Sequence, residues 1–147
     1  MTDEQSIWFG EPPTPESLNQ LLQNDAVGYM DMAFIEVGPA HLAAKLPLGP
    51  RTRQSFGLLH GGVSCVVAET MGSVMGNYVL DRERQFAVGL EINATHLNSA
   101  AGDGFVIATT RPVKLGGSVQ TTETRLVDDR GRDICIARLT TIVRDRR

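Results

Sequence analysis

The segment QSFGLLHGGVSCVVAETMGSVMGNYVL, residues 54–80, most constrains the fold of this chain. It predicts one buried helix that begins after Leu-His-Gly-Gly and carries one acidic residue, Glu69. At about 100° per residue, the helix has two opposite faces. The apolar face consists of Val63, Val67, Met71, Val74 and Tyr78. The opposite face, which is mostly of small residues, consists of Gly62, Cys65, Glu69, Ser73 and Gly76. Small residues also recur every fourth position, at Ser64, Ala68, Gly72 and Gly76, and predict close approach of another backbone. Such a helix can lie in a curled sheet, with Glu69 facing a crevice that a ligand can enter.

Short connections join the strands predicted around this helix. Four strands are expected after it, at 86–97, 104–115, 118–127 and 133–143, because β-branched residues alternate there between turns. In the first of them, period two places Phe86, Val88, Leu90, Ile92, Ala94 and His96 on one face. Segments 30–37 and 41–48 predict a hairpin, and 15–24 a short helix capped by Thr14. The order predicts an α+β fold with an antiparallel sheet and one central helix.

Composition narrows the class of protein. At 147 residues we expect a single domain, 1–147, in which residues 1–28 form an N-terminal segment with the short helix. A net charge of −3 without a basic stripe disfavours nucleic acid as a partner. The polar, acidic N-terminus and the lack of a long apolar run indicate no membrane partner and a cytoplasmic location. Cys65 and Cys135 have no CxxC spacing, and the three histidines lack metal-ligand spacing, so neither a metal nor a cofactor is expected.

The first turn of the predicted helix can bind a ligand through its backbone amides. Two glycines, Gly61 and Gly62, let a ligand approach the amides of the first turn, which carry the positive end of the helix dipole. Such amides bind an anion, or a carbonyl oxygen that becomes an oxyanion. Glu69 lies about two turns further along the helix, roughly 12 Å for eight residues at about 1.5 Å per residue. A reaction that uses both groups therefore requires the carboxylate of a second copy, which predicts a dimer.

The residues that carry this chemistry resemble those of a known family. Gln54, LLHGG, then Glu69 and Ser73, EINATH and RLTT follow the order found in hotdog-fold acyl-CoA thioesterases. The match extends from Met32 to Val143 and is to the branch with a helix-borne Glu, typified by 4-hydroxybenzoyl-CoA and 1,4-dihydroxy-2-naphthoyl-CoA thioesterases. The resemblance implies a hotdog fold, a homodimer with a continuous sheet and shared active sites, and a homotetramer of two such dimers.

The resemblance also implies roles for individual residues in hydrolysis of an aromatic or medium-chain acyl-CoA. Glu69 would be the nucleophile or general base, and the amide of Gly61 would polarise the thioester carbonyl. Further catalytic roles fall on Gln54 and His60, which would position the acyl group and water, and on Ser73, which would steady Glu69. Substrate-binding roles fall on Gly62, on His96 in the acyl or pantetheine channel, and on Arg138 near the nucleotide. Some relatives carry a basic residue where this chain reads KLGGSVQ, so recognition of the CoA phosphates is left open.

Several alternatives stay open at this stage. His60 could be a helix-start histidine bonded to backbone, Gln54 a loop residue and His96 a core histidine. A Ser-His-Asp hydrolase is disfavoured because the chain has no GxSxG. Rival functions on the same scaffold are a hydratase or dehydratase of acyl thioesters, whose His-Phe-Pro type motif is not found here, and a non-catalytic acyl-CoA sensor. The acyl group, the pathway and the choice between CoA and a carrier protein depend on pocket shape.

Overall fold

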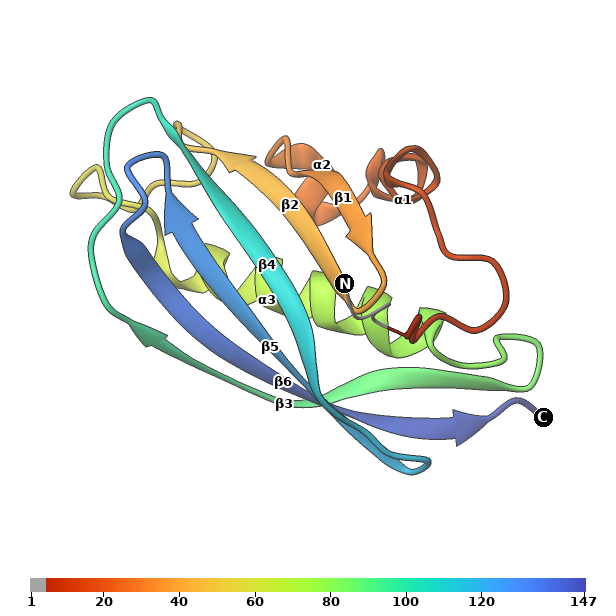
Figure 1. Cartoon of the computed structure of the whole chain (residues 1–147). Coiled ribbons are helices and arrows are strands. Elements are labelled where there is room, and N and C mark those ends of the chain that lie inside the picture. The colour runs from red at the N-terminus through yellow and green to blue at the C-terminus, as the bar shows by residue number, and fades with distance from the viewer. Residues whose placement is uncertain (1–4) are drawn as a thin grey trace.

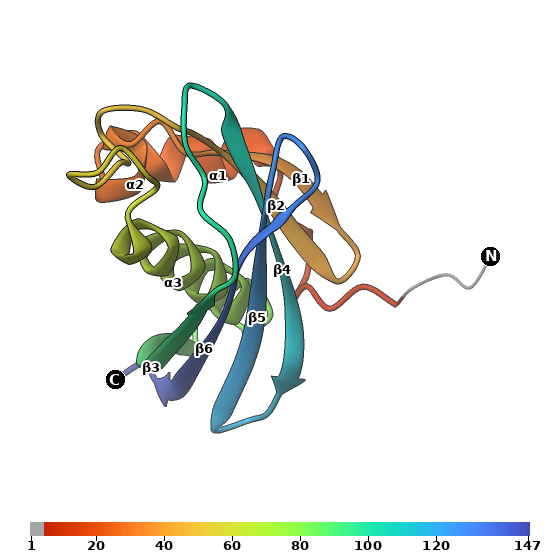
Figure 2. The ribbon, with the colours of Figure 1, turned by 90° about the vertical axis from the view of Figure 1, so that its left-hand side faces the viewer.

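A curved antiparallel sheet wraps around one long helix in the computed structural model, which describes residues 5–147 (Figure 1). Its six strands run in the order β1-β2-β4-β5-β6-β3. Their bounds are Ala33–Gly38 for β1, His41–Pro47 for β2, Gln85–His96 for β3, Phe105–Leu115 for β4, Val119–Asp128 for β5 and Asp133–Asp145 for β6. The helix, α3, runs from Gly61 to Tyr78 and lies in the hollow of the sheet (Figure 2). The predicted α+β fold is therefore confirmed.

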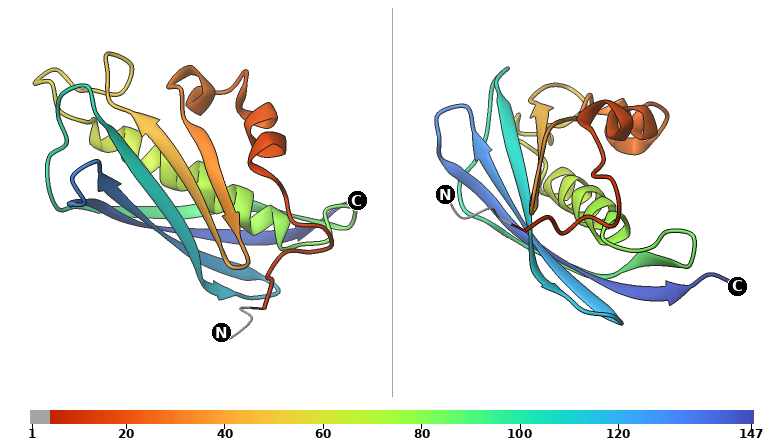
Figure 3. Two further views of the ribbon diagram at one scale, coloured as in Figure 1. Left: turned by 45° about the horizontal axis from the view of Figure 1, so that its top comes forward. Right: turned by 45° about the vertical axis from the view of Figure 1, so that its right-hand side comes forward.

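Two shorter helices precede the sheet. The predicted N-terminal helix is α1, Pro15–Leu22, and its first turn is closed by a capping box between Thr14 and Ser17. A second helix, α2, spans Ala26–Tyr29 and was not predicted, because four residues are too few for a helical period to be visible. Upstream of both, the amide of Phe9 donates to the carbonyl of Tyr78, so this segment passes the C-terminal end of α3 (Figure 3). No helix in residues 5–147 has the length and apolarity to cross a membrane.

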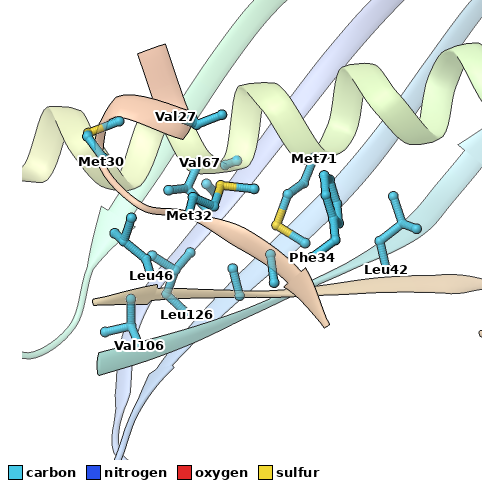
Figure 4. Close-up of a cluster of buried hydrophobic side chains, with 14 of the residues drawn as sticks. Val27, Met30, Met32, Phe34, Leu42, Leu46, Val67, Met71, Val106 and Leu126 are labelled. Carbon is cyan, nitrogen blue, oxygen red and sulfur yellow. The ribbon is translucent and has the colours of Figure 1, made fainter. Parts of the chain in front are cut away.

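The core lies between α3 and the strands on its apolar side. Val67 and Met71 of α3 are fully buried, and Phe34 of β1 packs beside Met71 (Figure 4). The labelled cluster also contains Val27, Met30, Met32, Leu42, Leu46, Val106 and Leu126. The predicted apolar face of the helix is thus confirmed. Burial of each large side chain contributes roughly 1.5–3 kcal/mol, so this cluster holds the helix in place.

The small residues of α3 face the central strands. A Cβ atom on Gly72 would lie 2.6 Å from Oγ1 of Thr122, and one on Gly76 would lie 2.6 Å from Oε1 of Gln120. Close approach was predicted, but strand side chains occupy the space that was expected to hold another backbone. Gly76 follows Glu69 by seven positions, which is about 20° around the helix at 100° per residue. Both face strands of the sheet, Gly76 towards Gln120 and Glu69 towards Gly89, so their predicted place on one side of the helix agrees with the structure.

Strand β3 departs from the predicted alternation. A bulge between Gly89 and Glu91 shifts its register against β6. Ala87 is therefore buried before the bulge, whereas Ile92 and Ala94 pack against the core after it. The prediction that residues 86 to 96 present one continuous face was wrong, because the extra residue of a bulge exchanges the two faces of a strand.

Candidate active site

A pocket of about 310 Å³ opens at the N-terminal end of α3. It brings together three residues that the sequence singled out, namely Gln54, Gly61 and His96. The other lining residues are Leu58, Leu59, Ser64, Leu97, Asn98, Ser99, Ala100 and Ile134. The loop before the helix, the first turn of the helix and the chain after β3 thus form its walls. Apolar side chains with a few polar groups between them are typical of a small-molecule site.

The loop before α3 fixes the orientation of Gln54. Its backbone amide donates to the carbonyl of Leu58 at 2.7 Å, and its carbonyl accepts from the amide of Gly57 at 2.9 Å. Gly57 has φ +82°, which closes the turn. The side-chain oxygen of Gln54 accepts from the amide of Phe56 and, at 3.5 Å, from that of Leu58. Because backbone donors surround the oxygen, the NH₂ group is the part of Gln54 that can donate to a ligand.

His60 caps the N-terminus of α3. Its Nδ1 accepts from the amide of Gly62 at 2.9 Å, and its own amide donates to the carbonyl of Thr52 at 2.9 Å. The backbone-bonded reading of His60 is therefore correct, and its ring is exposed outside the pocket lining. Gly62 was expected to offer its amide to a ligand; here that amide donates to His60 instead, and a role of Gly62 in substrate binding stays a prediction. The amide of Gly61 has no hydrogen-bond partner within residues 5–147.

His96 and Gly61 lie side by side in the pocket. A Cβ atom on Gly61 would fall 2.9 Å from Nε2 of His96 and 3.1 Å from its Cε1. A larger residue at position 61 would thus press against the imidazole and narrow the approach to the amide. His96 ends β3 and is exposed, so it is not the core histidine that the alternative interpretation described.

Glu69 and Ser73 lie further along α3, outside this pocket lining. The hydroxyl of Ser73 donates to Oε1 of Glu69 at 3.3 Å, and both side chains are half-buried. The carboxylate of Glu69 faces Gly89, where a Cβ atom on β3 would collide with it. The bulge that follows Gly89 belongs to an edge strand, so Glu69 lies next to the border of the sheet. The predicted pairing of Ser73 with Glu69 is present.

Arg138 lies apart from these residues. It is exposed on β6 between the buried Ala137 and Leu139, so it points to the outer face of the sheet, away from α3. Its Nε donates to Oε2 of Glu123 at 2.9 Å. A separate pocket of about 380 Å³ that contains Arg138 shares only Leu97 with the pocket of Gly61. A contact between Arg138 and substrate stays a prediction.

The structure also shows residues that sequence reasoning missed. Ser64, Asn98 and Ser99 line the pocket, and only Ser64 left a trace in the sequence, since it follows Gly61 at the i+3 spacing of one helical face. Cys135 is not a candidate nucleophile. Its burial, and to a smaller extent the nearby Cys65, raise the pKa of its thiol to about 11. The thiol is therefore protonated at neutral pH.

Comparisons with known proteins identify the family of this chain. Residues 56–135 match the family model described as Thioesterase superfamily. A 1,4-dihydroxy-2-naphthoyl-CoA hydrolase of Escherichia coli (strain K12) is 43% identical over 130 residues, covering 88% of this chain and 94% of that protein. Two crystal structures, each 37% identical, align with TM-scores of 0.92 and 0.89. The first is a mutant thioesterase PA1618 from Pseudomonas aeruginosa (96% of this chain, 100% of that chain), and the second is thioesterase HI1161 from Haemophilus influenzae (95% of each).

Proposed function

The chain belongs to the thioesterase superfamily and is a hotdog-fold thioester hydrolase, and we propose that it hydrolyses an aromatic or medium-chain acyl-CoA to the free acid and CoA. The observation that carries this proposal is the pocket in which the amide of Gly61, the side chain of Gln54 and apolar walls meet. The hydrolase from Escherichia coli acts on an aromatic acyl-CoA by its name, and it supports the same substrate class here. We also place the enzyme in the cytoplasm.

The first step of the proposed reaction is polarisation of the thioester carbonyl. The amide of Gly61 has no partner within residues 5–147 and lies at the positive end of an 18-residue helix. Gln54 lines the same pocket, and its NH₂ group is available as a second donor. Donors preorganised around a developing oxyanion contribute about 10²–10³ in rate each. The two groups thus stabilise the negative charge on the former carbonyl oxygen.

The second step uses the carboxylate of Glu69. It either attacks the carbonyl carbon, giving an anhydride that water then cleaves, or takes a proton from the attacking water. In both routes the C–S bond breaks, the electron pair leaves with sulfur, and the CoA thiolate is then protonated. Ser73 keeps the carboxylate in one orientation through its hydroxyl. Both roles of Glu69 are compatible with this geometry.

The carboxylate reaches the thioester from a second subunit in this proposal. Gly61 and Glu69 are eight positions apart on one straight helix, a separation of about 12 Å at 1.5 Å per residue. The outer edge of β3 has no strand neighbour within residues 5–147. Val66, Val88 and Leu90 are exposed on β3 and on the helix packed against it. Pairing of two β3 edges would cover these side chains and give a homodimer with shared sites; two such dimers would form a homotetramer.

A thiol-release assay over a panel of acyl-CoAs tests the proposed function. The panel contains acetyl-, hexanoyl-, decanoyl- and benzoyl-CoA, and the free CoA thiol is measured with a chromogenic disulfide. We expect kcat/KM to rise from acetyl- to hexanoyl-CoA, because each buried CH₂ contributes about 0.8 kcal/mol, and benzoyl-CoA to be hydrolysed at least as well as hexanoyl-CoA. Acetyl-CoA as the best substrate would contradict the proposed substrate class.

A further inference from the structure

Ser64 carries a buried hydroxyl that has no hydrogen-bond partner in residues 5–147. The residue is 1% exposed and lines the pocket beside Gln54 and Gly61. The hydroxyls of Thr70 and Ser73 on the same helix donate to the carbonyl of Val66 at 2.8 Å and to Glu69 at 3.3 Å. No such bond exists for Oγ of Ser64 within residues 5–147. Among the serine and threonine hydroxyls of α3, that of Ser64 is the one without a hydrogen-bond partner in residues 5–147, and its residue lines the pocket.

An unpaired polar group at this position costs free energy of folding. Apolar side chains of Leu58, Leu59, Ala100 and Ile134 contribute to the same pocket. An unpaired buried hydroxyl costs about 1–3 kcal/mol by mutational estimates, and Ala would favour the helix more than Ser. Among residues 5–147, the side-chain atoms that are both fully enclosed and without a hydrogen-bond partner are Nδ1 of His41 and Oγ1 of Thr122. Oγ of Ser64 also lacks a partner but is not fully enclosed, so it keeps a small accessible surface. A bound ligand can therefore supply its missing partner.

The place of Ser64 on α3 indicates which part of the ligand it meets. It follows Gly61 by three positions on the same side of the helix, about 4.5 Å along the axis at 1.5 Å per residue. The thioester carbonyl already has two donors, in Gly61 and Gln54. An acyl group that extends along α3 from the amide of Gly61 would place the atoms next to its carbonyl at Ser64.

We propose that Ser64 is a specificity-determining residue whose hydroxyl hydrogen-bonds an oxygen substituent on the bound acyl group. The inference rests on the proposed function, since an acyl group must occupy this pocket. It narrows the substrate class to acyl-CoAs that carry a hydroxyl or similar oxygen near the thioester. A site built to bond a substituent disfavours the analogue that lacks it, because its own polar group is then left unpaired.

Four substrates that differ by one oxygen atom test the inference: benzoyl-CoA and its 2-, 3- and 4-hydroxy derivatives. For the wild type we expect the best hydroxybenzoyl-CoA to exceed benzoyl-CoA in kcat/KM. Ser64→Ala should lower that ratio about three- to tenfold, the range of one net hydrogen bond, while kcat/KM for benzoyl-CoA changes less than twofold. Ser64→Cys keeps the size of the side chain and weakens its donor, so it should lower the ratio in the same direction and serves if the Ala variant does not fold.

Thr70→Val is the matched control, because it removes a hydroxyl from the same helix outside the pocket lining and should leave the ratio unchanged. An equal loss of kcat/KM on all four substrates would place Ser64 on the carbonyl or on water and overturn the inference. An unchanged ratio in both Ser64 variants would also overturn it, while the proposed function would stand. Thiol release from none of the four would overturn the aromatic part of the proposed function and the inference together.

Discussion

The first turn of α3 and the turn that carries Glu69 belong to one helix, yet their surroundings differ. The first turn opens into a pocket and offers the amide of Gly61 next to Gln54. The later turn places a half-buried carboxylate against Gly89 of the edge strand β3, where its hydroxyl partner is Ser73. In the proposed mechanism the first region binds the carbonyl and the second supplies the base or nucleophile, so each subunit would hold two half-sites that a partner completes. The comparison teaches that two groups on one helix can lie too far apart to act on the same substrate atom.

The largest effect is expected when the second region loses its charge. Glu69→Gln keeps the size of the side chain and its contact with Ser73 but removes the base, so kcat should fall about 10²-fold or more. Steady-state thiol release and a thermal melt of the same sample measure activity and folding. The matched control is Glu83→Gln, in the exposed turn before β3, which should keep wild-type rates. If the Glu69 variant kept a third of the activity, the role of its carboxylate would be refuted.

A smaller loss is expected when the first region loses one donor. Gln54→Glu retains an oxygen that can accept from the amides of Phe56 and Leu58 but replaces the NH₂ group. We expect kcat to fall about a hundredfold, the lower end of the range for one oxyanion donor, with an unchanged melting temperature. Gln54→Ala loses the loop contacts as well and should also melt earlier. Full activity in Gln54→Glu would show that the amide group does not contact the reacting carbonyl.

Mixing experiments test whether the two regions cooperate across subunits. Gly61→Val should be inactive because its side chain meets His96 at the pocket, and Glu69→Ala lacks the carboxylate. If both are dissociated, mixed and reassembled, about half of the dimers contain one of each chain. Each mixed dimer has one doubly altered site and one intact site, so activity should return to about a quarter of wild type.

Gly117→Ala provides the control for that experiment, since a Cβ atom there meets open space and the variant should be fully active. Native mass spectrometry establishes that mixed dimers formed. Mixed dimers without activity would place Gly61 and Glu69 in the same subunit's site and remove the basis for the half-site comparison.

The smallest effect concerns the face of α3 that contacts neither region. Gly72→Ala adds a methyl group 2.6 Å from Oγ1 of Thr122 and 2.7 Å from Cδ2 of Leu139. Overpacking costs about 1–3 kcal/mol, which exceeds or equals the gain of about 1 kcal/mol in helix propensity. Urea unfolding should therefore show an unchanged or lower free energy of unfolding, and thiol release should stay near wild type. A gain of 1 kcal/mol would mean that the helix and the sheet are less closely packed than the structure indicates.

Much of the architecture could be predicted from the amino-acid sequence. The strands and the helix at 61–78 follow from alternation, turns and the Leu-His-Gly-Gly start, because these signals are local and repeat many times. The family followed from the order of Gln54, the His60-Gly61-Gly62 motif and Glu69. The single domain, the cytoplasmic location and the roles of individual site residues stay predictions.

Other features were decided only by the tertiary structure. The capping of Gly62 by His60, the separation of Arg138 from the pocket and the bulge after Gly89 each depend on atoms that meet through the fold. Ser64 became notable only when its hydroxyl was found buried, unpaired and facing the pocket. Sequence patterns report the preferences of neighbours along a chain, whereas hydrogen-bond partners and burial depend on distances between segments far apart in sequence. For that reason the sequence determined the family and the helix with the candidate site residues, and the structure decided which groups on that helix line the pocket.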